Sequence, residues 1–283
     1  MALQSDISTL STPVSSIPLS TRMVSFLATA GAMLTTENPL IWSYTRGAAH
    51  PLADMSGPYY IYGAPNVNFA PGKAVLGATE DLKSEYNIMW LRRSPHQTDS
   101  APIIYTASPL FLFSGKVLGP NGEPVEATLD LWQANTRGEY WLSEYRNRGK
   151  ITVDPSTGSF EILTIPPAIY AILGAQRVAH IHGIITAPGY QSLITQIYLC
   201  PKNEPTGFQV DFLTMMRGNR ENMIKGWSIP TEKGDRYWDW PQLEPSETET
   251  VKLVEEWNSR LASQPDGWKI TCGASQVITL NKA

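Results

Sequence analysis

The sequence is poor in the features that mark several common classes of protein. Only two cysteines occur in 283 residues, Cys200 and Cys272, and they form no C-x-x-C pair. This excludes a zinc ribbon or a disulfide framework as the basis of the fold, and it favours reduced thiols in a cytoplasmic protein. The 22 basic and 26 acidic residues give a net charge of −4. Because no basic cluster offsets this balance locally, the sequence predicts no nucleic-acid partner.

Long apolar runs are also missing. The early stretch MVSFLATAGAML, residues 23–34, has 12 residues, whereas a helix that spans a bilayer needs about 20. We therefore expect a packing helix here and no membrane span. Arg22 and a Ser/Thr-rich leader precede this run. Translation that started at Met23 would turn the run into a signal sequence, so secretion is not excluded.

Composition divides the chain into three parts. Residues 1–20 are rich in Ser, Thr and Pro, which predicts a flexible N-terminal arm. Residues 21–109 form a mixed helical and loop region, with helices expected at 23–34 and 80–93. We expect this region to provide a dimerisation surface and a lid over a pocket. Residues 110–283 are predicted to be the catalytic core with a C-terminal extension.

The core has the pattern of a β-protein. Strand-length runs rich in β-branched and aromatic residues are separated by turn sequences such as GPNGEP and DPSTG. The expected strands are 111–118, 125–132, 158–165, 180–187, 192–199, 209–215 and 275–280. A helix is expected at 247–262. The fold class is therefore mainly β, with an antiparallel β-sandwich core, an N-terminal helical and loop appendage and a C-terminal helix.

One predicted strand carries two histidines. In RVAHIHGI, His180 and His182 are two residues apart, so in a strand their side chains lie on the same face. This geometry suits two neighbouring ligands of one metal ion. Alternatively, one imidazole is a hydrogen-bonded core residue and the other lies at the surface. Imidazole binds zinc, copper and iron, so the pair alone does not identify the metal.

Four sequence motifs surround this strand in a fixed order. They are W-Q-A-N followed by G-E-Y in residues 132–140, T-I-P-P-A-I-Y in 164–170, R-V-A-H-I-H in 177–182 and T-Q-I-Y in 195–198. In order and spacing they resemble the intradiol ring-cleaving dioxygenases, which split catechols between their two hydroxyl groups. The segment SGPYYIYGAP at 56–65 also resembles a segment of that family.

The resemblance implies a non-haem Fe(III) centre with four protein ligands, Tyr140, Tyr170, His180 and His182. Phenolate oxygens favour Fe(III), so the ion can act as a Lewis acid without an external reductant. By the same resemblance, Tyr140 and His180 stay bound throughout the reaction. Tyr170 leaves the metal and accepts a proton from the substrate.

Further roles follow from the resemblance for two polar residues. Arg177 would stabilise negative charge that develops on the substrate, although it could simply balance the charge of buried tyrosinates. Gln196 would border the iron pocket, or its amide could satisfy backbone groups of the sheet. Trp132 is interpreted as a core residue without a catalytic role.

The sequence departs from the family pattern at three positions. Val178 stands where proline is usual, Gly183 where phenylalanine is usual, and Ser56 where an acidic residue is usual. These changes predict a reshaped pocket. The residues expected to bind substrate are Met55, Pro58, Tyr59, Ile172 and Arg177.

Three functions remain open on the sequence. The first is intradiol cleavage of a simple catechol, hydroxyquinol or protocatechuate-like diol to a muconic-type diacid, with O2 as co-substrate and a homodimer as the assembly. The second applies the same iron chemistry to a larger aromatic substrate in a biosynthetic pathway, because the flanks of the motifs are unusual. The third is a cyclase, an isomerase or a binding protein that uses the fold without oxidation. Iron-free, colourless protein would favour the third.

Overall fold

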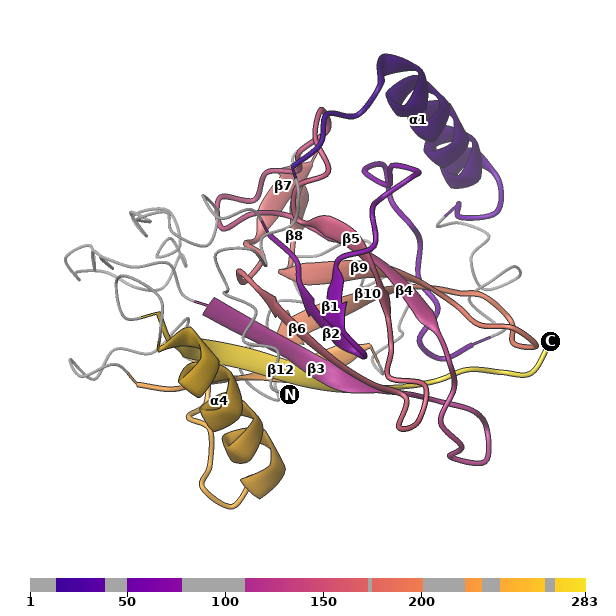
Figure 1. Ribbon diagram of the computed structural model, residues 1–283. Helices are drawn as coiled ribbons and strands as arrows, with labels where there is room; N and C mark the ends of the chain where they lie inside the picture. The colour runs from indigo at the N-terminus through magenta and orange to yellow at the C-terminus, as the bar shows by residue number, and fades with distance from the viewer. Residues whose placement is uncertain are drawn as a thin grey trace.

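The computed structural model describes residues 14–38, 50–77, 110–172, 175–200, 222–230, 240–262 and 268–283. These ranges contain two helices and twelve strands (Figure 1). The helices are α1 (Leu19–Leu34) and α4 (Thr248–Leu261). The strands are β1 (Asn68–Ala70), β2 (Lys73–Val75), β3 (Leu110–Leu118), β4 (Thr128–Gln133), β5 (Arg148–Thr152), β6 (Ser159–Thr164), β7 (Tyr170–Ile172), β8 (Ala175–Arg177), β9 (His180–Thr186), β10 (Leu193–Cys200), β11 (Met223–Ser228) and β12 (Ile270–Thr279).

Ten of the strands form one hydrogen-bonded sheet that is folded on itself. Its strand order is β1-β2-β6-β3-β12-β11-β10-β9-β4-β5, and β7 and β8 form a separate pair. The mainly β prediction is confirmed. The description of the core as antiparallel needs a correction, because β2–β6, β3–β12 and β10–β11 run parallel. The closing strand at the C-terminus lies beside the first strand of the core, which local turn sequences do not reveal.

The hydrophobic core lies between the two halves of this sheet. Side chains from β3, β6 and β12, such as Phe113, Phe160 and Ile278, form one cluster with side chains from β4, β9 and β10, such as Leu131 and Ile181. Each of these side chains is almost fully buried. Burying one side chain of this size contributes about 1.5–3 kcal/mol, so the sandwich rests mainly on this layer.

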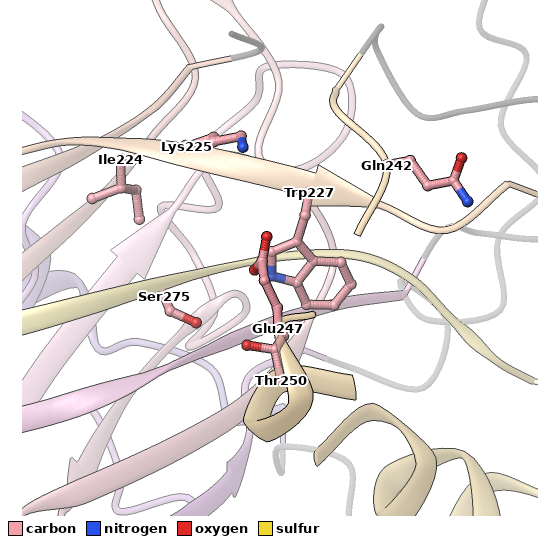
Figure 2. A pocket seen from close by; sticks show the side chains of 7 residues that line it. All are labelled: Ile224, Lys225, Trp227, Gln242, Glu247, Thr250 and Ser275. Atoms are coloured by element: carbon pink, nitrogen blue, oxygen red, sulfur yellow. The ribbon is translucent and has the colours of Figure 1, made fainter. Parts of the chain in front are cut away.

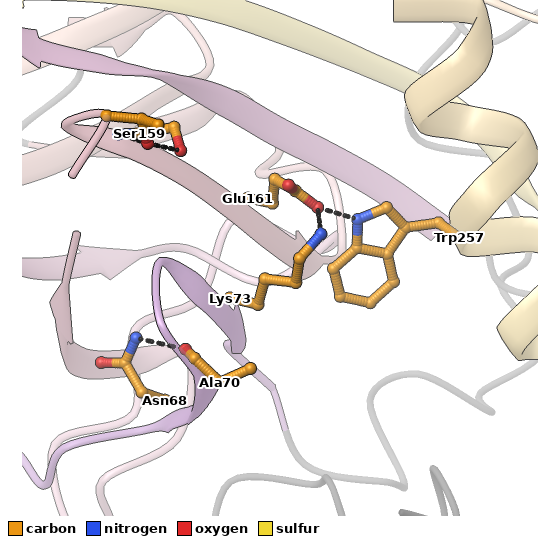
Figure 3. Close-up of polar contacts among 7 residues, drawn as sticks. Asn68, Ala70, Lys73, Ser159, Glu161 and Trp257 are labelled. Carbon is orange, nitrogen blue, oxygen red and sulfur yellow. Dashed lines mark hydrogen bonds and ion pairs between the residues drawn. The ribbon is translucent and has the colours of Figure 1, made fainter. Parts of the chain in front are cut away.

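Helix α4 covers the outer face of the β3 and β6 half (Figure 1). Val254, Trp257 and Leu261 are its buried residues, at the spacing of one helix face. The indole nitrogen of Trp257 donates a hydrogen bond of 2.8 Å to Glu161 Oε2, and Lys73 Nζ lies 2.5 Å from the same oxygen (Figure 3). The helix is therefore held by both apolar packing and a shared carboxylate.

Helix α1 confirms the predicted N-terminal helix but begins at Leu19, inside the segment expected to be a flexible arm. Ile17, just before it, is buried, and its N–H donates to the carbonyl of Ser143 at 2.7 Å. The helix turns small polar residues towards the protein. Ser25 and Thr29 are its buried residues, and Ser25 Oγ accepts a hydrogen bond of 3.1 Å from the N–H of Tyr62.

Three expected features lie outside the described residues: the arm at 1–13, the helix at 80–93 and the strand at 209–215. Neither helix of the described ranges is long and apolar enough to cross a membrane. Cys272 is a buried free thiol.

Candidate metal centre

The register of three strands brings the predicted site residues together on one face of the sheet. His182 on β9 lies between Trp132 on β4 and Gln196 on β10, and His180 lies opposite Tyr198. Side chains two residues apart in a strand share a face. All five therefore form a polar and aromatic layer on the face opposite the core residues Leu131 and Ile181.

The two imidazoles converge as the H-x-H spacing predicted. Their Nε2 atoms lie 3.0 Å apart, and both rings are about 99% buried. Nδ1 of His180 lies 2.5 Å from the carbonyl of Val178, which assigns the proton to Nδ1 and leaves the Nε2 lone pair available for a cation.

His182 is oriented mainly by stacking. The Trp132 ring lies parallel to its imidazole, with 4.8 Å between centroids and 6° between planes. Nδ1 of His182 has no hydrogen-bond partner within the described ranges. Gly57 approaches the other side, where an added Cβ would lie 3.2 Å from His182 Cε1. The φ of Gly57 is +70°, a conformation that suits glycine.

Tyr140 is carried by a tight loop between β4 and β5. Asn135 organises this loop, because its Oδ1 accepts hydrogen bonds from the N–H groups of Arg137 and Glu139 at 2.8 and 3.0 Å. Gly138, with a φ of +79°, lets the loop pass against Tyr170, where a Cβ would meet the Ile169 carbonyl at 2.7 Å. The Tyr140 hydroxyl lies 3.2 Å from Nε2 of His182.

Tyr170 closes the cluster from the other side. Its ring centroid is 5.3 Å from that of Tyr140 and 5.5 Å from that of His180. Tyr59, which is only partly buried, stacks on Tyr140 with centroids 4.5 Å apart and meets Tyr170 edge-on at 6.1 Å. The four predicted metal ligands and one predicted substrate contact therefore lie in a single cluster.

This donor set suits a hard trivalent cation better than zinc. Two phenol rings and two imidazole rings lie together, whereas no group of three His, Cys, Asp or Glu side chains does so in the ranges that the structure describes. The Nε2 atoms of His180 and His182 are 3.0 Å apart, so both could bind the same ion. The residues present therefore fit a non-haem ferric ion.

Burial sets the protonation of these donors. It raises the pKa of Tyr140 well above its ordinary value, and the neighbouring Tyr170 raises it further. It lowers the pKa of His182 well below its ordinary value, helped by the charge of His180. The imidazole therefore stays neutral, as a ligand must be, and the phenol needs a bound cation in order to lose its proton.

Arg177 and Gln196 form a hydrogen-bonded pair beside the ligands. An Nη2–H of Arg177 donates to Gln196 Oε1 at 2.7 Å, and Gln196 Nε2–H donates to the Met55 carbonyl at 2.8 Å. Both side chains are buried. The alternative in which the amide of Gln196 satisfies a backbone carbonyl is present in the structure, and the same amide also accepts a hydrogen bond from Arg177.

The remaining predicted pocket residues are placed differently. The side chain of Met55 is 1% exposed and packs in the core, so only its carbonyl faces the arginine pair. Pro58 is partly buried next to Tyr59, and the side chain of Ile172 is outside the described part. Gly183 faces the core, where an added Cβ would lie 3.0 Å from Leu131 Cδ2. This substitution therefore changes core packing, and the expected reshaping of the pocket stays a prediction.

Comparison with known proteins agrees with this geometry. Residues 93–214 match the family model described as Dioxygenase. This range includes all four predicted metal ligands as well as Arg177 and Gln196. Over this range the chain is similar to the Dioxygenase family.

Named relatives and solved structures of this family extend the comparison. A chlorocatechol 1,2-dioxygenase of Rhodococcus opacus is 35% identical over 108 residues, which are 30% of this chain and 42% of that relative. A catechol 1,2-dioxygenase of Pseudomonas sp. is 28% identical over 51% of this chain and 45% of its own length. The matched segments thus span less than half of these relatives.

The crystal structure of 3-chlorocatechol 1,2-dioxygenase from Rhodococcus opacus 1CP is similar with a TM-score of 0.54 and 23% identity, covering 92% of this chain and 87% of that one. Catechol 1,2-dioxygenase from Pseudomonas arvilla C-1 has a TM-score of 0.53 and 21% identity, covering 94% and 74%. These likenesses concern the fold.

Four buried residues near the site were not identified from the sequence: Glu37, Asp54, Trp132 in its stacking role, and Arg148. Glu37 Oε2 accepts two hydrogen bonds of 2.8 Å from the N–H and hydroxyl of Ser56. Position 56 itself carries no carboxylate, and the carboxylate of Glu37 lies next to it instead. The only sequence signal for this contact was the acidic residue that is usual at position 56, because no local pattern links Glu37 to Ser56.

A hollow of about 300 Å³ lies away from this cluster, between α4 and β11 (Figure 2). Its lining residues are Ile224, Lys225, Trp227, Gln242, Glu247, Thr250 and Ser275. None of the predicted site residues lines it, and its one lysine and one glutamate form no charged cluster. We assign it no part in the chemistry.

A buried carboxylate next to this layer predicts pH-dependent stability. Burial raises the pKa of Asp130 to about 6, although the Tyr60 hydroxyl donates to its Oδ2 at 3.0 Å and so lowers the pKa somewhat. A carboxyl whose pKa is raised by folding stabilises the fold below its ordinary pKa of about 4, and this contribution is lost as the pH rises through about 6.

Asp130→Asn should therefore gain stability relative to the natural chain as the pH rises from 4.5 to 7.5, by about 3 kcal/mol at most. Urea unfolding of both proteins at the two pH values measures the difference. Equal differences at pH 4.5 and 7.5 would show that Asp130 titrates normally.

Proposed function

We propose that this protein is a non-haem Fe(III)-dependent intradiol dioxygenase that inserts both atoms of O2 between the hydroxylated carbons of a catechol-type aromatic. The product is a muconic-type diacid. The observation that carries the proposal is the position of His182 Nε2, which lies 3.0 Å from His180 Nε2 and 3.2 Å from the Tyr140 hydroxyl, with the Tyr170 ring packed against that of Tyr140. The match of residues 93–214 to the Dioxygenase family model supports the same chemistry.

Tyr140, Tyr170, His180 and His182 would hold the ferric ion. When bound, the ion would act as a Lewis acid that the diol chelates, which would make the ring of the diol reactive towards O2. The Oη of Tyr170 would accept one proton from the diol. Arg177, which is buried and lies opposite Tyr170 in the β7–β8 pair, would stabilise negative charge on the ring as it reacts.

The substrate we favour is a simple aromatic diol. The named relatives act on catechol and chlorocatechol. Tyr59 stacks on Tyr140 and is partly exposed, so it can contact a flat ring at the mouth of the site. Because Gly183 faces the core, the departure at this position does not favour a larger biosynthetic substrate.

Iron analysis and oxygen uptake test this function together. Protein expressed with ample iron should contain about one iron and little zinc per chain, and it should be burgundy because tyrosinate transfers charge to Fe(III). It should consume O2 with at least one member of a panel from catechol to bulky catechols and hydroquinones. Stoichiometric zinc, or colourless protein that consumes no O2, would refute the proposal.

We also propose a homodimer through α1. Six large apolar residues of this helix are more than half exposed: Leu19, Met23, Val24, Phe26, Leu27 and Leu34. The helix carries a single charge, Arg22, so two copies can pack together with little repulsion. An exposed apolar patch of this kind marks an interaction surface.

Light scattering should show a dimer at micromolar concentration, and Phe26→Glu combined with Leu27→Glu should produce a monomer. Val277→Glu is the matched control, since Val277 is a similarly exposed apolar residue on β12. A natural chain that is monomeric at micromolar concentration would contradict the proposal.

A further inference from the structure

We propose that Asp54 is a positioning residue for Arg177, acting through the hydroxyl of Tyr198. The inference rests on the proposed function, because it assigns a role in the same reaction. Neither Asp54 nor Tyr198 is one of the proposed metal ligands. Both are at most 2% exposed.

Asp54 accepts three described hydrogen bonds from three segments of the chain. Its Oδ1 accepts from the N–H of Met55 at 2.6 Å. Its Oδ2 accepts from the hydroxyl of Tyr198 at 2.9 Å and from Nδ2 of Asn222 at 3.3 Å. All three partners are donors, which is the pattern that an ionised carboxylate requires.

The hydrogen bonds between Asp54 and Arg177 have a direction. A guanidinium can only donate, so Arg177 Nη2 donates to the Tyr198 hydroxyl at 3.3 Å. A carboxylate can only accept, so the single hydroxyl proton of Tyr198 goes to Asp54. Gln196 Oε1 lies 3.1 Å from the same hydroxyl and accepts a hydrogen bond from Arg177, while the Nε2–H of Gln196 donates a hydrogen bond to the Met55 carbonyl. The order is therefore Arg177, Tyr198, Asp54.

The physical reason for this arrangement is the cost of a buried cation. Arg177 is 2% exposed, and a buried charge is tolerated when it is compensated by an opposite charge and by hydrogen bonds. Asp54 supplies the opposite charge at a fixed place behind Tyr198. Tyr198 also packs against the ring of His180, with centroids 5.4 Å apart. Tyr198 therefore fixes the position of Arg177 relative to a proposed metal ligand.

Asp54 also fixes the segment that reaches the site. Its N–H donates to the Ile194 carbonyl on β10 at 2.8 Å, and the chain then runs through Gly57 and Tyr59 to the ligand cluster. Loss of the carboxylate should allow Arg177 to shift towards the tyrosines. We expect a slower reaction with the metal still bound.

The experiment is a double-mutant cycle between Asp54→Asn and Arg177→Gln, read in two ways. In iron-loaded protein, Asp54→Asn should lower kcat by about 10- to 100-fold with unchanged iron content, and it should add no further loss in the Arg177→Gln background. Tyr198→Phe, which keeps the ring and removes only the hydroxyl, should behave in the same way if Asp54→Asn folds poorly.

In metal-free protein, each single substitution should lower the unfolding midpoint by on the order of 10 °C, because it leaves a buried charge uncompensated. The double variant should lose less than the sum. Asp130→Asn is the matched control, since Asp130 is also a buried carboxylate that accepts a hydrogen bond from a tyrosine, Tyr60. Its effects should be additive with Arg177→Gln.

Additive losses for Asp54→Asn and Arg177→Gln in either readout would overturn the inference, as would a kcat of Asp54→Asn equal to that of the natural chain. If the natural chain turned over no diol at all, the proposed function would fail instead. The unfolding cycle would then decide alone whether Asp54 holds Arg177.

Discussion

Tyr140→Phe is expected to lose most of the iron, whereas Tyr170→Phe should keep measurable iron and lose most of the rate. The difference follows from the proposed roles, in which Tyr140 stays bound and Tyr170 gives up its position to the diol. Loss of a group that accepts a proton in the reaction typically lowers the rate by roughly 100- to 10,000-fold. Tyr170→His should behave like Tyr170→Phe.

The packing of the two phenols is consistent with these roles. Tyr140 sits on a loop that is tightly hydrogen-bonded around Asn135, and its hydroxyl is 3.2 Å from a ligand nitrogen. Tyr170 begins the short strand β7, which pairs only with β8 among the described strands. A ligand on such a short pair can move more easily than one on a closed loop.

Iron content and single-turnover kinetics on the same preparations measure both effects. Should Tyr170→Phe retain both iron and the natural turnover, the role given to Tyr170 would be wrong and another tyrosine would have to be tested. Tyr198 would be the choice, because its ring lies 5.4 Å from that of His180. The hydroxyl of Tyr190 lies instead beside Glu123 and Lys282.

Arg177→Gln is expected to lower kcat by about 100- to 1,000-fold while iron remains bound. The buried guanidinium would stabilise charge that develops on the substrate, and glutamine supplies hydrogen bonds without the positive charge. Arg177→Lys is the matched variant, because it keeps the charge and loses the planar fork that bonds Gln196 and Tyr198. We expect its rate to be intermediate.

Steady-state kinetics with iron analysis distinguishes the two roles considered for this arginine. If Arg177 served only to balance the tyrosinates, its replacement would reduce iron content and leave kcat per bound iron unchanged. That result would rule out the proposed role in charge stabilisation.

The clustering of the proposed metal ligands could be predicted from sequence because their placement depends on local rules and recognisable motifs. Strand periodicity puts His180 and His182 on one face, whatever the rest of the chain does. The W-x-A-N motif also has a local structural role, because its Asn135 forms the turn that positions Tyr140 five residues later. The mainly β core followed from the same short-range patterns.

The residues that surround the ligands could not be predicted in this way. Asp54 and Tyr198 are 144 residues apart in sequence. Glu37, just after α1, accepts hydrogen bonds from Ser56, which is 19 residues further along the chain. Such contacts depend on which strands pair and in which register, and that is decided by the packing of the whole sandwich.

The sequence by itself predicted six of the twelve described strands, a set of proposed metal ligands and a resemblance to the intradiol dioxygenases. Only the tertiary structure decided that the apolar side of α1 faces outward, that Gly183 lies against the core, and that Arg177 is tied to Asp54. The physical reason is that the side of an element that becomes buried, and the distant group that compensates a buried charge, are chosen by long-range packing.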